Sequence, residues 1–332
     1  MVADKVAGLL AILRQSADAA HVLRPILSLS FGILLFACSD PECDVECGDA
    51  GAGDDGGSDA VTGDVRVADA AVRDSGPRPD VPFVEPVFVY GHTRSGLYEL
   101  NPRDSSLRFV GDFDCVEAGD NISDSAAGMT DLAVDRDGAM FGVGRASPDD
   151  RFHVLMRVTP ATGACSLVGG VMLDGDPATV QGLSFVPAGT LDATQEVLVG
   201  SNGAGAFFRI DRETGVASSL GTIDVESDIR GGDIVSIAGA ASWVITSANS
   251  LVEFDLVSGD VVSERPIVGA PASDSLGWGL GYWGGSIYAF SFLGKLYAID
   301  TESAVLSEIA IPDAPAELSF RGAAVTTIVP LI

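Results

Sequence analysis

The stretch LYAIDTESA, residues 296–304, is one of five copies of a pattern that runs through this sequence of 332 residues. Apolar residues stand at its second and fourth positions, which is typical of a strand with one buried face. The fifth position is Asp300, whose side chain can hold an adjacent turn. Each copy therefore predicts a strand, a tight turn and a second strand. The other copies are residues 97–105 (LYELNPRDS), 155–163 (LMRVTPATG), 207–215 (FFRIDRETG) and 251–259 (LVEFDLVSG), of which the last three end in Gly, the residue that favours a positive φ.

The copies recur at intervals of about 44 to 58 residues, which is typical of the blades of a β-propeller. Upstream of three copies lie patterns of an inner strand, at residues 131–138, 182–189 and 279–285, each followed by a second strand. Residues 322–330 (GAAVTTIVP) form an inner-strand pattern with nothing after it, whereas the first unit lacks one. We therefore predict an all-β protein, a five-bladed β-propeller closed by the C-terminal strand. Six blades would follow if residues 114–128 or 171–179 contained a further set of strands.

The repeat resembles those of known propeller families. LYAIDTES and FFRIDRETG are similar to the Leu-Tyr-x-Ile-Asp-x-x-Thr-Gly repeats of quinoprotein-like, NHL-like and kelch-like propellers, over about residues 84–332. The resemblance implies the architecture alone. Quinoprotein dehydrogenases carry Trp shortly after the Gly, where this chain has Leu167, Leu220 and Val262, so we expect no quinone and no other cofactor.

The N-terminal segment has the pattern of a secretory signal. Residues 26–37 (ILSLSFGILLFA) follow Arg24 and are too few to cross a bilayer as a helix. Residues 35–38 (LFAC) resemble the lipobox of bacterial lipoproteins, although Phe36 replaces the usual small residue. The resemblance implies that Cys38 is lipidated and anchors the protein to a membrane of the cell envelope, and Ser39 after it favours the outer membrane. An ordinary cleaved signal or a buried segment is the alternative.

Residues 39–82 are rich in Asp, Gly and Ala and nearly lack large apolar residues. Such a composition cannot bury enough surface to fold, so we predict a disordered linker. Calcium binding by its acidic run is an alternative, but no complete Asp-x-Asp-x-Asp-Gly loop is present. The predicted organisation is a signal segment at 1–38, a linker at 39–82 and the propeller at 83–332.

Four cysteines remain besides Cys38, an even number that is consistent with disulfides in an oxidising compartment. We expect Cys43 to pair with Cys47 and Cys115 with Cys165. Zinc is the competing interpretation, but one pair lies in the linker and the other has no His nearby, so we expect no metal site.

Aligning the inner strands predicts a polar pocket at one mouth of the central channel. Thr130, Gln181, Trp278 and Arg321 fall at equivalent positions, and acidic residues follow in two of the strands. Alternatively, the strand ends simply face water. The predicted binding residues are Thr130, Asp131, Gln181, Asp233, Trp278 and Arg321.

Other patterns favour structural roles. Residues 279–284 match a dinucleotide fingerprint, but no helix follows to bind the pyrophosphate. His92 and His153 belong to no catalytic or metal motif. Residues 135–138 (DRDG) are typical of a hairpin turn rather than a cation site. We expect packing between blades, rather than stacking on a sugar, for the aromatic residues Trp243, Trp278, Tyr282 and Trp283.

The formal net charge of −28 repels phosphate backbones, which excludes nucleic acid as an expected partner. We predict a monomeric, lipid-anchored, non-catalytic binding or scaffolding module for a protein or glycan, with no catalytic residue. The alternative is a hydrolase or lyase at the channel mouth, with Asp131 or Asp233 as acid, base or cation ligand. The fold alone does not decide between these classes.

Overall fold

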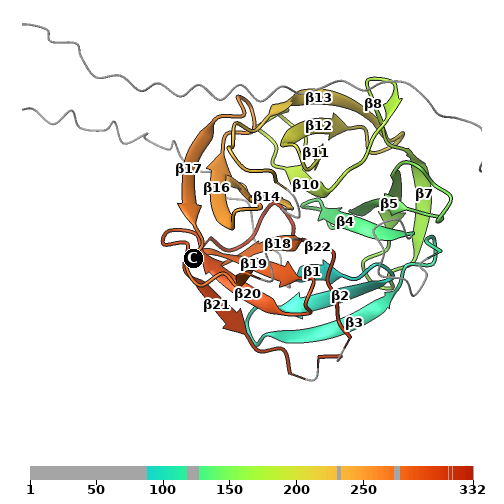
Figure 1. Cartoon of the computed structure of the whole chain (residues 1–332). Helices are drawn as coiled ribbons and strands as arrows, with labels where there is room; N and C mark the ends of the chain where they lie inside the picture. The colour runs from blue at the N-terminus through green and yellow to red at the C-terminus, as the bar shows by residue number, and fades with distance from the viewer. Residues whose placement is uncertain are drawn as a thin grey trace, which may run out of the picture. The chain divides into compact units, whose positions relative to one another are not determined.

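The structure, a computed structural model, describes residues 88–117, 127–229, 233–272, 277–312, 314–315 and 317–331. Within these ranges the chain forms five sheets arranged as a ring around a central channel (Figure 1). The five-bladed propeller is therefore confirmed. Cys38, the linker and the Cys43–Cys47 pair lie outside the described residues.

Four of the sheets have four strands, ordered from the channel outward. The first contains β22 (Gly322–Ala324), β1 (Val89–His92), β2 (Gly96–Asn101) and β3 (Ser106–Asp112). The second contains β4 (Gly128–Val134), β5 (Met140–Arg145), β6 (Val154–Val158) and β7 (Cys165–Gly170). The fourth contains β14 (Ile234–Ser236), β15 (Ser242–Ile245), β16 (Ser250–Phe254) and β17 (Val261–Pro266). The fifth contains β18 (Trp278–Trp283), β19 (Ser286–Ser291), β20 (Leu296–Asp300) and β21 (Leu306–Ile309).

The third sheet has six strands because a short hairpin extends its outer edge. Its blade strands are β10 (Gly182–Val186), β11 (Val197–Ser201), β12 (Ala206–Ile210) and β13 (Val216–Thr222). β8 (Met172–Leu173) pairs with β13 in parallel, and β9 (Asp176–Pro177) pairs with β8. Residues 171–179 therefore add to an existing blade and make no sixth one.

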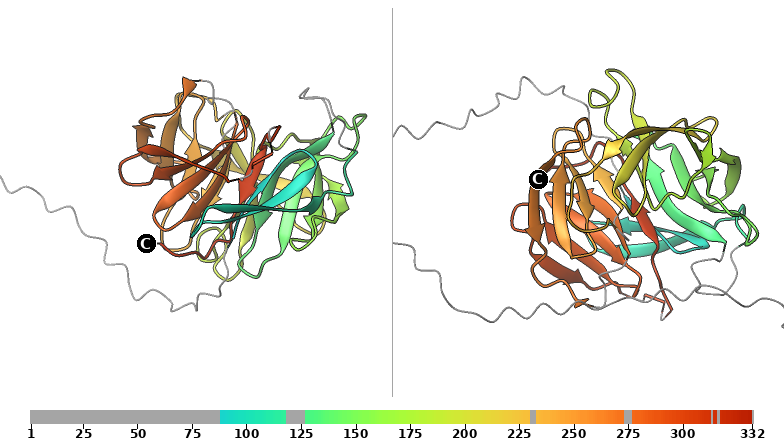
Figure 2. Two further views of the ribbon diagram at one scale, coloured as in Figure 1. Left: turned by 90° about the horizontal axis from the view of Figure 1, so that it is seen from below. Right: turned by 45° about the horizontal axis from the view of Figure 1, so that its top comes forward.

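Burial decreases from the channel outward. Every residue of β10 and β11 is buried, whereas β17 alternates between half-buried and exposed positions. The inner strands are covered by neighbouring blades on both faces, which is why they read as continuous apolar runs. The views of Figure 2 show the twisted sheets side by side around the channel. Trp243 stacks on Tyr282 with ring centroids 5.4 Å apart, so these aromatic side chains pack between blades as expected.

The repeated turn has one conformation in all five copies. Its ninth residue has a positive φ in every blade: Ser105 59°, Gly163 77°, Gly215 80°, Gly259 81° and Ala304 55°. The backbone N–H of each bonds to the carbonyl four residues earlier, as in Gly215 to Asp211 at 2.8 Å. The fifth residue holds the turn as predicted, since Asp211 Oδ1 accepts from the backbone N–H of Thr214 at 2.9 Å.

These turns also lie against the outer strand of the preceding blade. A Cβ added at Gly163 would lie 2.8 Å from the Gly111 carbonyl oxygen, and one at Gly215 would lie 2.8 Å from that of Gly170. Glycine at the ninth position therefore permits both the positive φ and a close approach between blades.

The two ends of the propeller meet in the first sheet. β22 pairs with β1 through Tyr90 with Ala324, Gly91 with Ala323 and His92 with Gly322 (Figure 1). The predicted closing strand over 322–330 is shorter than expected. Beyond Ala324 the backbone bonds to turns of the fourth and fifth blades, with Ala238 N–H donating to Thr327 O at 2.8 Å and Gly284 N–H to Pro330 O at 2.9 Å.

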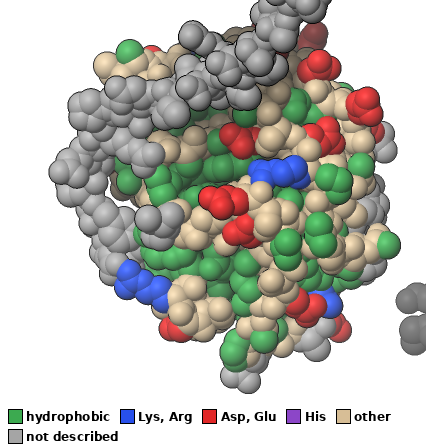
Figure 3. Space-filling view, turned by 90° about the vertical axis from the view of Figure 1, so that its left-hand side faces the viewer, with side chains coloured by type: hydrophobic (Ala, Val, Ile, Leu, Met, Phe, Trp, Pro, Cys, Tyr) green, Lys and Arg blue, Asp and Glu red, His purple; other side chains and the backbone are tan. Residues whose placement is uncertain are grey.

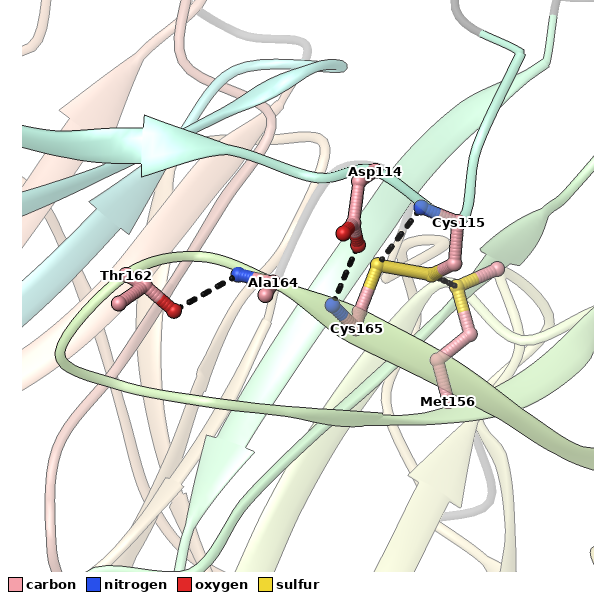
Figure 4. Close-up of a disulfide and its surroundings, with 6 residues drawn as sticks. All are labelled: Asp114, Cys115, Met156, Thr162, Ala164 and Cys165. Atoms are coloured by element: carbon pink, nitrogen blue, oxygen red, sulfur yellow. Dashed lines mark hydrogen bonds between the residues drawn. A yellow bond between two sulfur atoms is a disulfide. The ribbon is translucent and has the colours of Figure 1, made fainter.

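The disulfide between Cys115 and Cys165 is confirmed, with Cα atoms 5.3 Å apart. It joins the segment after β3 to the first residue of β7, so it links the first blade to the second. Figure 4 shows the Met156 sulfur beside the bridge and Asp114 turned toward the Cys165 backbone, whose N–H donates to Asp114 Oδ1 at 2.7 Å.

The outer strands carry exposed hydrophobic side chains. Val257, Val262 and Val268 lie in or next to β17, and all three are exposed. Figure 3 shows this side of the molecule, where hydrophobic side chains lie among acidic ones. Among the residues that the structure describes, no helix has the length and apolar character needed to cross a membrane.

Candidate functional site

The inner strand of each blade leaves one edge unpaired along the channel, and its backbone N–H groups need acceptors there. Five of these donors, one from each blade, occupy equivalent positions in the inner strands, and we call them the amide ring. The ring consists of the backbone N–H groups of Leu132, Leu183, Ile234, Leu280 and Ala323.

Two aspartates supply all the acceptors for this ring. Asp131 Oδ1 accepts from Leu132 N–H at 2.9 Å, and its Oδ2 accepts from Leu183 N–H of the next blade at 2.5 Å. Asp233 Oδ1 accepts from Ile234 N–H at 2.6 Å, and its Oδ2 accepts from Leu280 N–H of the next blade at 3.0 Å.

Asp233 also accepts from Ala323 N–H of the closing strand β22. The carboxyl pair, Asp131 and Asp233, therefore ties neighbouring blades together across the channel.

Glycine at two equivalent positions leaves room for the carboxyl pair. A Cβ at Gly322 would overlap Asp131 Oδ1 and His92 Nε2, and a Cβ at Gly279 would overlap the backbone of Gly322. The space on the axis thus suits two acidic side chains among small neighbours. This explains why two inner strands have Asp at this position and the other three have Gly.

Burial dominates the electrostatics of the pair. Asp131 is 0% exposed and Asp233 is 2% exposed. Burial raises the pKa of Asp131 well above its usual range, and the charge of Asp233 raises it further. Burial likewise raises the pKa of Asp233 to about 7, against hydrogen bonds from Asp131 and from three backbone N–H groups that favour its ionised form.

His92 lies beside the pair, a neighbour that the sequence analysis did not assign. Its Nε2 is 3.9 Å from Asp131 Oδ1, and its Nδ1 bonds to the Thr93 carbonyl at 2.8 Å. Because a carbonyl can only accept, Nδ1 carries the hydrogen and Nε2 carries none. Burial lowers the pKa of His92 to about 4, so the ring is neutral at pH 7. The feature that could have pointed to His92 was its position in the strand that pairs with Gly322 of the closing strand.

A small cavity of about 10 Å³ lies between the inner strands, lined by residues such as Leu183, Ile234 and Ala323. That volume holds about one water molecule. Asp131 and Asp233 are themselves buried, and this cavity has no room for an organic substrate.

An open cleft of about 320 Å³ lies at the ends of the third-blade strands, next to the segment that leads into β14. Asn202 is held within it because its Oδ1 accepts from Ala204 N–H at 3.0 Å and from Ala206 N–H at 3.1 Å. The side chains of Thr179 and Gln181 are exposed. The cleft is lined by Thr179, Gln181, Asn202, Gly203, Ala204 and Asp228.

The structure divides the predicted binding residues among different environments. Asp131 and Asp233 are buried at the channel, and Gln181 lines the cleft. Trp278 is buried and packs edge-on against Tyr297 at 5.3 Å, so its indole is not open to a ligand.

The remaining two are half-buried. Thr130 lies at an irregularity in the pairing of β4, and the Arg321 guanidinium stacks over Phe292 at 4.5 Å. The six residues therefore do not form one pocket.

The described part of the chain contains no group of three or more His, Cys, Asp or Glu that could hold a metal ion. Because N–H donors point at the oxygens of the carboxyl pair, the site favours a negative charge and disfavours a bound cation.

No family model and no curated protein matches the chain. Among solved structures, BamB from Moraxella catarrhalis is similar with 14% identity and a TM-score of 0.31, over 66% of this chain and 56% of that one. A protein of unknown function from Bacteroides thetaiotaomicron has 14% identity and a TM-score of 0.40, over 70% and 61%. Apo AztD from Citrobacter koseri has 15% identity and a TM-score of 0.31, over 72% and 62%. The chain spans less than two thirds of each of these proteins, and the similarity is distant.

Proposed function

We propose that this protein is a non-catalytic binding module of the bacterial cell envelope, anchored through lipidated Cys38. The module presents the cleft beside Gln181 to a glycan. The observation that carries the binding function is the contrast between two sites. The acidic residues of the channel are buried and engaged with backbone N–H groups. The cleft, in contrast, is open and has room for a small ligand.

The chemistry of the cleft favours a glycan over a protein. Its side chains are a hydroxyl, two carboxamides and a carboxylate, from Thr179, Gln181, Asn202 and Asp228. Such groups match the hydroxyls of a sugar. Protein interfaces depend on apolar or aromatic anchors seated in pockets, and the described lining of this cleft contains no aromatic residue.

The anchor and linker fit this function. A lipid at Cys38 would hold the protein at the membrane, since each buried CH₂ contributes about 0.8 kcal/mol. The acidic residues 39–82 would then act as a spacer between the membrane and the propeller.

A panel of envelope and extracellular glycans, measured by isothermal titration calorimetry, tests the proposal. We expect a saturable heat with at least one class of glycan, and a tenfold or greater loss of affinity in Gln181→Ala and Thr179→Ala. Gln195→Ala is the matched control, because this exposed residue lies in the connection at the opposite end of the same strands. No binding across the panel, or equal losses in all three variants, would overturn the glycan assignment.

One observation favours a hydrolase or lyase as the second candidate. Two adjacent carboxyls with raised pKa values are typical of acid–base sites. This candidate requires the channel to open to substrate. Hydrolysis or elimination of a panel glycan by the wild type, lost in Asp233→Asn, would support it over the binding function.

A further inference from the structure

Residues 325–331, which we call the strap, follow the closing strand and run to the fourth and fifth blades (Figure 1). Their carbonyls accept hydrogen bonds from the turns between the inner and second strands of these blades. Ala238 N–H donates to Thr327 O at 2.8 Å, and Gly284 N–H donates to Pro330 O at 2.9 Å. The inner strands begin on the side of the cleft and end at these turns, so the strap lies at the opposite mouth of the channel.

A side chain of the strap is anchored in the third blade. The Thr327 hydroxyl donates to Glu196 Oε1, in the connection that leads into β11, and Thr327 is 1% exposed. The other oxygen of this carboxyl accepts from Arg136 N–H of the second blade at 2.8 Å. The second blade therefore positions the acceptor independently of the strap.

Alternate side chains of the strap point into the protein. Val325, Thr327 and Val329 are buried, whereas the residues between them are half-buried. The two valines pack in the same apolar cluster as Ile237, Trp243 and Tyr282. Backbone hydrogen bonds combined with contacts to every second side chain are how proteins recognise an extended peptide. The turns of the third, fourth and fifth blades thus form a groove that holds the strap as a peptide.

The strap is attached more weakly than the strand before it. β22 forms a ladder with β1, as in the pairing of Tyr90 with Ala324. Within the described part of the chain, in contrast, no backbone N–H of the strap donates to another backbone group. A segment that is bonded mainly through its carbonyls opens at a lower free energy than a paired strand. The strap can therefore leave the groove while β22 stays in the first sheet.

We propose that this groove is a binding site for an extended segment of a partner protein, that the strap occupies it in cis, and that the partner segment displaces the strap. The recognised pattern has a hydroxyl residue for Glu196, with a β-branched apolar residue two positions before it and another two positions after it. The site lies at the other end of the propeller from the glycan cleft, so neither assignment depends on the other.

Two threonine substitutions in the full-length protein test the anchor. Thr327→Val removes the bond to Glu196 and keeps the β-branched shape. It should increase the released population of the strap about tenfold, because a hydrogen bond to a carboxyl group is lost. Thr326→Val is the matched control, since the Thr326 hydroxyl bonds to the Ile328 carbonyl within the strap itself, at 3.0 Å. This control should behave as the wild type.

Hydrogen exchange followed by NMR at Ala238 and Gly284 measures the release, because their N–H groups donate to the strap. We expect both amides to exchange about tenfold faster in Thr327→Val than in the wild type and Thr326→Val. The amide of Leu183 in the ring should not change. An excess of the synthetic peptide VTTIVPL, the sequence of the strap, should restore the protection of both amides in Thr327→Val.

Exchange at Ala238 and Gly284 that changes in parallel with Leu183 would show that the strap opens only when the whole fold does, and would overturn the proposal. Added peptide that leaves the protection of both amides unchanged would also overturn it. The same peptide carrying Thr327→Val should protect about tenfold less well, and equal protection would overturn the role of Glu196. Dimers formed by Thr327→Val without peptide would assign the groove to the strap of a second copy, against a separate partner.

Discussion

His92 of β1 pairs with Gly322 of β22, and the space where a side chain at position 322 would lie is occupied by His92 Nε2 and Asp131 Oδ1. The strand that closes the ring therefore lies directly against the carboxyl pair. Closure of the ring and hydrogen bonding in the channel belong to one structural unit.

The first prediction concerns this contact. Gly322→Ala should lower the free energy of unfolding by about 3 kcal/mol, because its Cβ overlaps buried atoms that have no space to move into. Urea denaturation measures the loss. Gly284→Ala is the control, since that glycine has a φ of 55° but open space around it and should cost about 1 kcal/mol. An equal cost for both variants would contradict the steric argument.

The turn at the ninth position of the repeat leads to a stabilising substitution. Ser105 has a φ of 59°, where the equivalent residues of three other blades are glycine. Ser105→Gly should therefore raise the free energy of unfolding by about 0.5–1 kcal/mol. The reciprocal change Gly215→Ala should destabilise, because its Cβ would lie 2.8 Å from the Gly170 carbonyl oxygen. Thermal unfolding of both variants checks these signs, and two changes of the same sign would contradict them.

Removing the disulfide should weaken the link between the first two blades. Cys115 and Cys165 are 50 residues apart in the sequence. A disulfide that closes a loop of this length adds about 4 kcal/mol to the free energy of unfolding, because it limits the conformations of the unfolded chain. The double variant Cys115→Ala/Cys165→Ala is expected to lose this amount in a chemical denaturation experiment. A reducing agent should lower the Tm of the wild type and leave that of the double variant unchanged.

The buried histidines predict a loss of stability in acid. Burial, and then the nearby Arg145, lowers the pKa of His153 from 6.5 to about 4. The contribution of His153 to the free energy of unfolding is complete above pH 6.5. It is lost as the pH falls from 6.5 to about 4, by up to about 3 kcal/mol.

The carboxyl pair changes the stability in the opposite direction over this pH range. The quantity to measure is therefore the difference in free energy of unfolding between the wild type and His153→Gln. That difference should shrink from pH 7 to pH 4 as the wild type loses the contribution of the histidine. Gln can still accept from Val180 N–H, the bond that His153 Nδ1 makes at 3.1 Å. A difference that does not vary with pH would show that the histidine does not titrate as inferred.

Lipidation at Cys38 is testable in cells. Cys38→Ala should move the protein from the membrane fraction to the soluble envelope fraction and abolish incorporation of labelled palmitate. Cys47→Ala is the control, and it should leave both results unchanged. Labelling that persists in Cys38→Ala would contradict the lipobox assignment.

Much of the fold was predictable because its signals are local. The alternation of apolar residues in 296–304 predicts a strand with one buried face. Asp300 and the residues after it predict the turn. Closure was predictable because residues 322–330 read as an inner strand, whereas the first unit lacks one. The extent of that strand was not, because Thr327 and Pro330 bond to turns of other blades, and such partners leave no trace in local sequence.

The candidate site was less predictable. The alignment correctly placed Asp131 and Asp233 at equivalent positions, but it could not show whether they face solvent or each other. Gln181 lines the cleft, whereas Trp278 at the equivalent position packs into the core against Tyr297. Equivalent positions in a repeat share backbone geometry, but their side chains meet different neighbours.

The sequence by itself determined the repeat, the propeller architecture and the presence of a closing strand, because strand alternation and turn conformation depend on short stretches of residues. Five blades and the Cys115–Cys165 pair were expectations from the sequence that the structure confirmed. Only the tertiary structure decided that the carboxyl pair is buried, that His92 joins it and that the open cleft lies to one side. Burial depends on how closely five separate strands approach one axis, which is set by packing between residues that are distant in the chain.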